Sequence, residues 1–148
     1  AELDVAWATV APASGGTQFD LARMTEAGIR VGLGEDGQRD YWSPYGNCDM
    51  LDRTWQLAFT HRLRKDRLIE HCAAIATIGG ASIMDRTTQR LTSPGDRPGL
   101  ALGDRADIVL VDGQTVTRTV MDRGTDRTVI HDGRLVADGQ VVLPNAAA

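Results

Sequence analysis

The sequence predicts an α/β fold over residues 1–92, followed by a β-rich tail over residues 93–148. The chain begins with a strand, a loop, a helix and a second strand, which is the order of a β/α repeat with parallel strands. Past a segment containing Ser, Pro and Gly, the pattern changes to short β-branched runs separated by Asp-Gly turns. The length of 148 residues suits one ordinary domain. It is far short of the about 250 residues of a complete eight-stranded β/α barrel.

The first half of the chain shows the repeat clearly. Residues 5–10 are β-branched, aromatic or small and end in a loop rich in Ala, Ser and Gly, which predicts a buried strand. Apolar residues then recur at helical spacing from 19 to 27, and Gly28 ends that pattern. A second apolar run over 29–33 predicts the next strand.

Helical spacing returns after a loop over residues 34–47 that is rich in acidic, polar and aromatic side chains. Apolar residues from 50 to 59 predict one helix, and those from 68 to 76 predict another with Asp66 as its N-cap. Gly79 and Gly80 either break this helix or let it pack closely on a neighbour.

The pattern of the tail predicts strands and turns. Residues 108–111 form a continuous apolar run, and residues 116–120 alternate between apolar and polar, so both are predicted strands. Asp132 and Gly133 lie between two further β runs, which predicts a hairpin.

Composition excludes several classes of protein. No uncharged apolar run reaches the about 18–20 residues of a membrane span, and the acidic start of the chain is unlike a secretory signal. A net charge of −4 gives no overall attraction for nucleic acid. Two cysteines fit neither a disulfide framework nor a four-cysteine zinc site, which indicates a reducing cytoplasmic setting. Because the chain opens without Met, we expect a segment before Ala1.

Residues 32–37 match the Gly-x-Gly-x-x-Gly pattern of dinucleotide-binding folds. The surroundings disfavour that function, because no helix begins at these glycines and two carboxylates between them would repel phosphate. Alternatively, Asp36 lies just past the carboxyl end of a barrel strand, where such enzymes place groups that bind metals or move protons. Glu35 and Asp36 could equally face solvent in a turn. Spacing alone leaves the last two readings open.

Four segments together resemble the amidohydrolase superfamily. The loop at 32–37, continued by Asp-Tyr-Trp-Ser-Pro-Tyr-Gly at 40–46 and Met-Leu at 50–51, resembles the loop after the eighth barrel strand in its cytosine deaminase branch. Ala-Thr-Ile-Gly-Gly-Ala at 76–81 is similar to a helix motif of the superfamily. Residues 99–112 resemble its Gly-x-x-x-Gly-x-x-Ala-Asp strand, and residues 129–136 resemble its closing hairpin. The resemblance runs from about residue 5 to 142.

This resemblance implies the last two β/α units of a metal-dependent, TIM-like hydrolase barrel, followed by part of a β-sandwich. In such enzymes a metal-activated water attacks a ring carbon of a cyclic substrate and ammonia leaves. Asp36 matches the residue that binds the metal, zinc or iron, and shuttles protons. Trp42 matches an aromatic wall against a flat heterocycle, and Glu35 and Gly37 fall beside the substrate.

The sequence also departs from the family. Gly37 stands where cytosine-specific members carry a second Asp, and Glu35 stands where His is common. No His-x-His pair is present, and we expect His61, His71 and His131 to be structural or surface residues rather than ligands. Most metal ligands are therefore expected outside this chain.

Two hypotheses follow. The chain is the C-terminal part of a deaminase-like hydrolase, inactive alone, that assembles with an N-terminal barrel segment, a partner chain or a second copy in an oligomer. Alternatively, it is a non-catalytic binding or interaction module that retains the second half of the fold.

Overall fold

The computed structural model describes residues 3–11, 18–41, 44–86, 89–96 and 102–144. The chain forms two compact units, residues 1–98 and residues 99–148, and each is described by itself. The boundary predicted after residue 92 falls just before this division.

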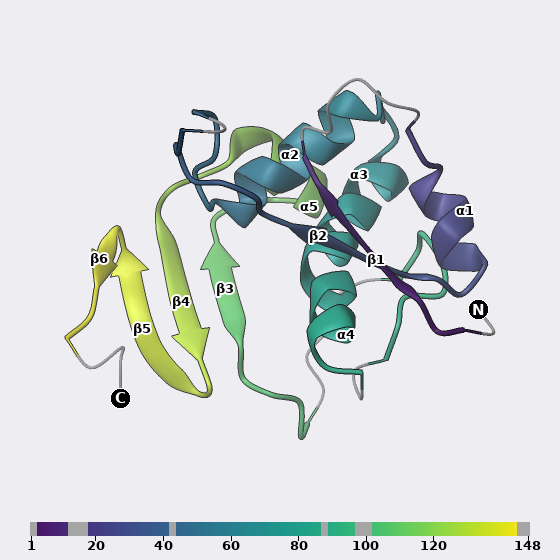
Figure 1. The fold of residues 1–148 in the computed structure, drawn as a ribbon. Helices are drawn as coiled ribbons and strands as arrows, with labels where there is room; N and C mark the ends of the chain where they lie inside the picture. The colour runs from purple at the N-terminus through teal and green to yellow at the C-terminus, as the bar shows by residue number, and fades with distance from the viewer. Residues whose placement is uncertain (1–2, 12–17, 42–43, 87–88, 97–101, 145–148) are drawn as a thin grey trace. The chain divides into compact units, whose positions relative to one another are not determined.

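The first unit is built on two parallel strands, β1 (Ala6–Val10) and β2 (Arg30–Gly34), joined through helix α1 (Leu21–Glu26) (Figure 1). Their register pairs Val10 with Gly34, so the chain leaves both strands at the same edge. The Asp20 side chain caps α1 by accepting from the Arg23 N–H at 3.1 Å. The predicted order of strand, helix and parallel strand is confirmed, but β1 is not the buried strand that was predicted, because its residues are half-buried or exposed.

Three further helical segments follow β2. They are α2 (Met50–Thr60), α3 (Asp66–Ala74) and α4 (Gly80–Met84), with a π-helical turn, η1 (Ile75–Gly79), between the last two. Asp66 does not cap α3 as predicted: Lys65 occupies that position without a side-chain cap bond, and Asp66 lies in the first helical turn. A carboxylate there still interacts favourably with the helix dipole.

Gly79, the last residue of η1, allows close packing, and the helical segments continue through Gly79 and Gly80 without a break. A Cβ on Gly79 would lie 2.2 Å from the carbonyl oxygen of Val31 in β2. Residues Val31 and Leu33 are themselves buried, as is Ile75 on the facing helix. The centre of this unit is therefore β2 backbone in direct contact with helix backbone, and the close-packing alternative is the correct one.

The second unit is a four-stranded antiparallel sheet. Its strands β3 (Ile108–Val111), β4 (Arg127–His131), β5 (Arg134–Gly139) and β6 (Val141–Val142) follow in that order. Asp132 and Gly133 have φ values of 49° and 74°, as the two central residues of a type I′ turn require. The predicted hairpin is confirmed.

The strand predicted over residues 116–120 is wrong, because this segment is helix α5 (Val116–Asp122). The Thr115 side chain caps the helix by accepting from the Arg118 N–H at 3.1 Å. Arg118 also pairs with Asp122 one turn later, at 3.1 Å. Alternation over five residues was too short to exclude a helix whose polar side faces water.

No helix in the described ranges is long and apolar enough to cross a bilayer.

Candidate functional site

The candidate site begins where β2 ends. Glu35, Asp36 and Gly37 follow the strand directly, and the end of β1 lies beside them in the sheet. The Asp36 side chain is exposed and makes no hydrogen bond or ion pair with any residue that the structure describes. Its carboxylate is thus available to a ligand at the carboxyl edge of the parallel pair.

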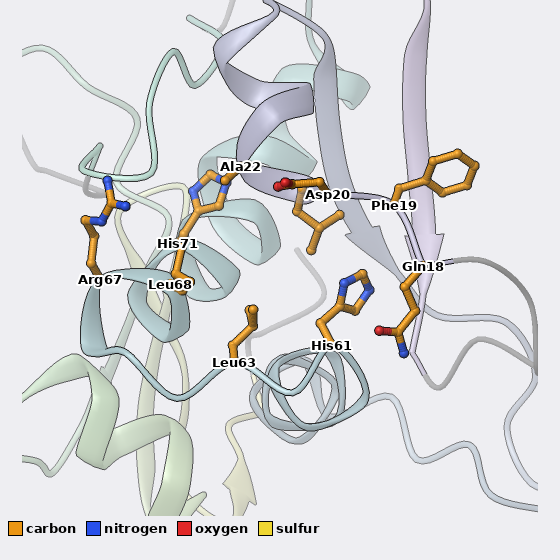
Figure 2. Close-up of a pocket in the computed structure, with 10 residues that line it drawn as sticks. Gln18, Phe19, Asp20, Ala22, His61, Leu63, Arg67, Leu68 and His71 are labelled. Carbon is orange, nitrogen blue, oxygen red and sulfur yellow. The ribbon is translucent and has the colours of Figure 1, made fainter.

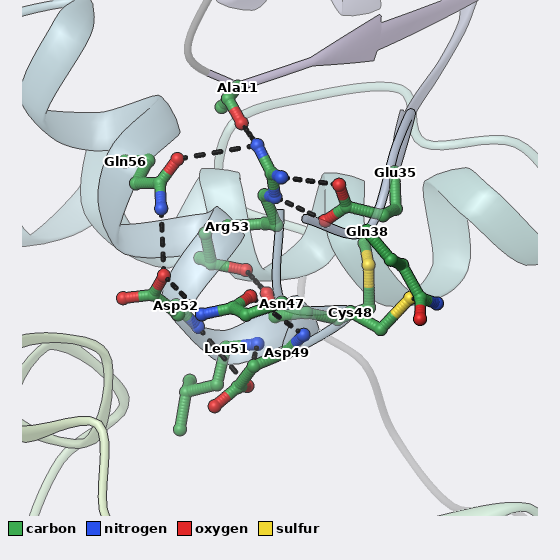
Figure 3. Close-up of polar contacts among 12 residues, drawn as sticks. Ala11, Glu35, Gln38, Asn47, Cys48, Asp49, Leu51, Asp52, Arg53 and Gln56 are labelled. Atoms are coloured by element: carbon green, nitrogen blue, oxygen red, sulfur yellow. Dashed lines mark hydrogen bonds and ion pairs between the residues drawn. The ribbon is translucent and has the colours of Figure 1, made fainter. Parts of the chain in front are cut away.

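Glu35 is placed very differently from its neighbour. Both of its carboxylate oxygens accept hydrogen bonds from Arg53 on α2, one from Nε and one from Nη2 (Figure 3). The two side chains are 12% and 5% exposed, respectively. This is a bidentate ion pair largely removed from water, and its geometry fixes both groups. The predicted contact of Glu35 with substrate stays a prediction.

Arg53 also reaches the other strand. Its Nη1 donates to the carbonyl oxygen of Ala11, the residue after β1, and to Gln56 Oε1 at 3.4 Å. Gln56 Nε2 in turn donates to Asp52 Oδ2 at 2.7 Å. One buried guanidinium therefore ties the carboxyl ends of β1 and β2 to helix α2.

The loop between β2 and α2 is closed by its own polar groups. Asn47 Nδ2 donates to Asp52 Oδ2 at 3.0 Å, and the Asp49 N–H donates to Asn47 Oδ1 at 3.0 Å. Asp49 then caps α2, its Oδ1 accepting from the N–H groups of Leu51 at 3.0 Å and Asp52 at 3.3 Å. Figure 3 shows this chain of contacts running from the loop to Arg53.

Glycine is required at two places where the loop folds back on itself. Gly37 has a φ of +80°, and a Cβ there would lie 2.8 Å from Asp40 Oδ2. A Cβ on buried Gly46 would lie 1.7 Å from the Gly37 carbonyl oxygen. A second Asp at position 37 would therefore be strained in this loop. Trp42, the predicted aromatic wall, lies outside the described residues.

The three histidines lie elsewhere. His71 is 2% exposed, and its Nε2 lies 3.0 Å from the hydroxyl of Thr25, which itself donates to the Leu21 carbonyl at 2.9 Å. Burial lowers the pKa of His71 below its ordinary value, so the ring is neutral near pH 7. His131 is exposed and its Nδ1 lies 2.7 Å from Asp107 in the second unit.

A pocket of about 450 Å³ opens between α1, α2 and α3 (Figure 2). His61, whose pKa burial lowers, and His71 contribute to its lining, together with Asp20 and Arg67. None of Glu35, Asp36 or Gly37 lines it. The pocket is therefore separate from the candidate site.

The residues at the end of β2 fit a metal site only as one part of it. Within the described ranges, no three His, Cys, Asp or Glu side chains are grouped so that they could hold a metal ion. A catalytic zinc needs about three protein ligands, and the exposed, unpartnered Asp36 carboxylate is suited to be one of them. The rest of the ligand set has to come from other residues.

Arg53 was not identified from the sequence. Its position in the predicted helix did not indicate that it would be buried, because an arginine in an amphipathic helix usually faces water. A signal existed in Glu35: a carboxylate next to a buried strand must be exposed or paired with a cation. That requirement points to a cation on the helix that follows, where Arg53 lies.

Comparison with known proteins identifies the family. A model of the amidohydrolase family matches residues 5–137, and the chain belongs to that family. This confirms the family resemblance of the loop, helix and tail motifs.

Individual relatives agree with this assignment. The chain is 25% identical over 123 residues to N-isopropylammelide isopropyl amidohydrolase of Pseudomonas sp. strain ADP, matching 83% of this chain and 28% of that protein. It superposes with a TM-score of 0.77 on the crystal structure of N-isopropylammelide isopropylaminohydrolase from Burkholderia multivorans, at 33% identity over 96% of this chain and 34% of the other. The crystal structure of 5-methylcytosine deaminase from Klebsiella pneumoniae superposes with a TM-score of 0.60 at 25% identity. The match covers 83% of this chain and 28% of that one. The chain thus spans about a third or less of the length of these relatives.

Proposed function

We propose that this chain is the C-terminal part of a metal-dependent hydrolase that cleaves a C–N bond of a cyclic substrate, as a cytosine deaminase-like aminohydrolase. The observation that carries the proposal is Asp36: an exposed carboxylate without a protein partner among the described residues, at the carboxyl end of a parallel strand. Relatives named for N-isopropylammelide and 5-methylcytosine support a nitrogen-containing ring as the substrate.

In this proposal Asp36 has two roles. Its carboxylate is one ligand of a divalent metal, zinc or iron, and the remaining ligands lie outside this chain. When bound, the metal would supply Lewis-acid activation of water. Asp36 accepts the proton of the attacking water and returns it to the leaving nitrogen, so that ammonia or an amine departs. Trp42, Glu35 and Gly37 are assigned to the substrate side of the same loop.

The fold is completed by residues beyond this chain. In the described part of the molecule β1 pairs only with β2, and Val5, Trp7 and Val10 on or beside it are exposed. An edge strand with such side chains is suited to further pairing. We therefore propose a TIM-like barrel formed with an N-terminal segment or a partner chain, and a β-sandwich completed around the sheet of the second unit. Oligomer formation and a cytoplasmic location stay predictions.

The test compares the complete protein with its Asp36→Asn variant, which keeps the shape of the side chain and removes its charge. Metal content is measured together with release of ammonia or isopropylamine from cytosine, 5-methylcytosine and N-isopropylammelide. We expect loss of bound metal and a fall in kcat/KM of about 10²- to 10⁴-fold, with a melting temperature equal to that of the metal-free wild type. Glu26→Gln, at another exposed carboxylate, is the matched control.

Metal content and kcat/KM equal to the wild type in Asp36→Asn would overturn the proposal. A protein that binds no metal and releases no amine from any of these rings would instead support the non-catalytic binding module.

A further inference from the structure

We propose that Arg53 is a positioning residue for Asp36, acting through its ion pair with Glu35 and its bond to the end of β1. This inference rests on the proposed function, since it assigns Arg53 a part in placing the carboxylate that binds metal. In this inference Arg53 acts through its contacts with Glu35 and Ala11 and is assigned no contact with metal or substrate.

The first step concerns how Asp36 is held. Its carboxylate has no partner of its own among the described residues, so its place is set by the backbone alone. Consecutive Cα atoms are about 3.8 Å apart across a planar peptide, so a shift of the Glu35 backbone also changes where the Asp36 backbone begins. The Glu35 side chain is therefore a point directly beside Asp36 at which the fold can fix the position of this segment.

The second step concerns how Glu35 is held. Two donors of one planar guanidinium bind its two oxygens, which fixes direction as well as distance. Arg53 is 4% exposed overall and has a third attachment at the Ala11 carbonyl. The guanidinium therefore contacts the segments that follow both β1 and β2, and it fixes the direction of the Glu35 side chain (Figure 3).

A matched control lies at the opposite end of the same strand. Arg30, the first residue of β2, is also buried, at 7% exposed, and pairs with Asp4 at 3.2 Å and with the Ser82 carbonyl at 3.0 Å. It is an arginine in comparable surroundings, but its contacts are at the amino end of β2. Substitution of Arg30 therefore measures how much stability the fold loses when a buried arginine away from the candidate site is removed.

The experiment uses the complete protein with Arg53→Met, Arg53→Lys and Arg30→Met substitutions. Affinity for Zn²⁺ alone is measured by competition with a chelator, and kcat, KM and melting temperature are measured in parallel. We expect Arg53→Met to weaken Zn²⁺ binding about 10- to 100-fold and to lower kcat more than it changes KM. Arg53→Lys should recover only part of the loss, because an ammonium cannot bind both oxygens in the same way. Arg30→Met should lower the melting temperature only.

The inference would be overturned if Arg53→Met kept the Zn²⁺ affinity and kcat of the wild type. It would also be overturned if Arg30→Met lost as much Zn²⁺ affinity and kcat as Arg53→Met. If Arg53→Met does not fold, Glu35→Gln replaces it, because this variant keeps the shape of the side chain and loses its charge. The same weakening of Zn²⁺ binding is expected there, and its absence counts against the inference. Failure of Asp36→Asn to change metal binding would reject the proposed function itself, which separates the two outcomes.

Discussion

Replacement of Gly79 by alanine should show how directly the β2 backbone rests on the helix behind it. The added Cβ would lie 2.2 Å from the Val31 carbonyl oxygen, an atom of a buried strand that cannot swing aside as a flexible side chain could. Overpacking of this kind costs about 3 kcal/mol. Alanine regains about 1 kcal/mol of helix propensity over glycine. We therefore expect the free energy of unfolding to fall by about 2 kcal/mol.

Gly80→Ala is the control for this prediction, because the next residue has room for a side chain. A Cβ on Gly80 would be 3.9 Å from the nearest backbone oxygen, that of Leu33. The gain in helix propensity should then stand alone and raise the free energy of unfolding by about 1 kcal/mol. Urea denaturation of the two variants measures the difference, which we expect to be about 3 kcal/mol. Equal stability of Gly79→Ala and Gly80→Ala would refute this account of the packing.

Two further predictions concern helices α2 and α3 of the first unit. Asp49→Ala should lower the free energy of unfolding, measured by urea denaturation, by about 1 kcal/mol, because the Asp49 side chain caps α2. Asp49→Asn should leave this free energy unchanged, because asparagine caps helices equally well. Equal effects of the two substitutions would contradict the capping role of Asp49. For His71, the folded-state pKa is lowered by burial, so below the ordinary value of 6.5 the unfolded chain binds more protons. The stability of the protein should fall as the pH drops below 6.5. Melting temperatures measured over a pH series should fall less in His71→Gln than in the wild type. The same pH dependence in both proteins would count against buried His71 as the cause of the fall.

Elements whose apolar residues follow a long or distinctive pattern could be predicted from the sequence. The strands at 5–10 and 29–33, the two helices after the loop and the Asp-Gly hairpin were predicted to within a few residues of their observed ends. Helix α5 was missed because Val116 and Val120 fit a short strand as well as one side of a helix. The choice depended on the Thr115 cap, a local hydrogen bond that a five-residue pattern does not reveal.

The site was predictable only in part, for a related reason. The position of Asp36 after a strand follows from chain order, because the carboxyl ends of parallel strands meet at one edge. The identity of the partner of Glu35 does not follow from chain order. Arg53 is 18 residues away and contacts Glu35 only when α2 packs beside the end of β2. Contacts made by tertiary packing between two charged residues leave no periodicity in the sequence.

The contrast between Glu35 and Asp36 favours a working site over a simple polar turn. In a turn that merely faces solvent, two adjacent carboxylates would both be hydrated, but here Glu35 is largely removed from water against Arg53 and Asp36 is exposed. A buried ion pair adds little net stability, because desolvation offsets most of the attraction between the charges. What such a pair does provide is a defined geometry at the ends of β1 and β2. Asp36, which has no partner among the described residues, lies one residue away, and this placement supports Asp36 as the group for which the geometry is maintained.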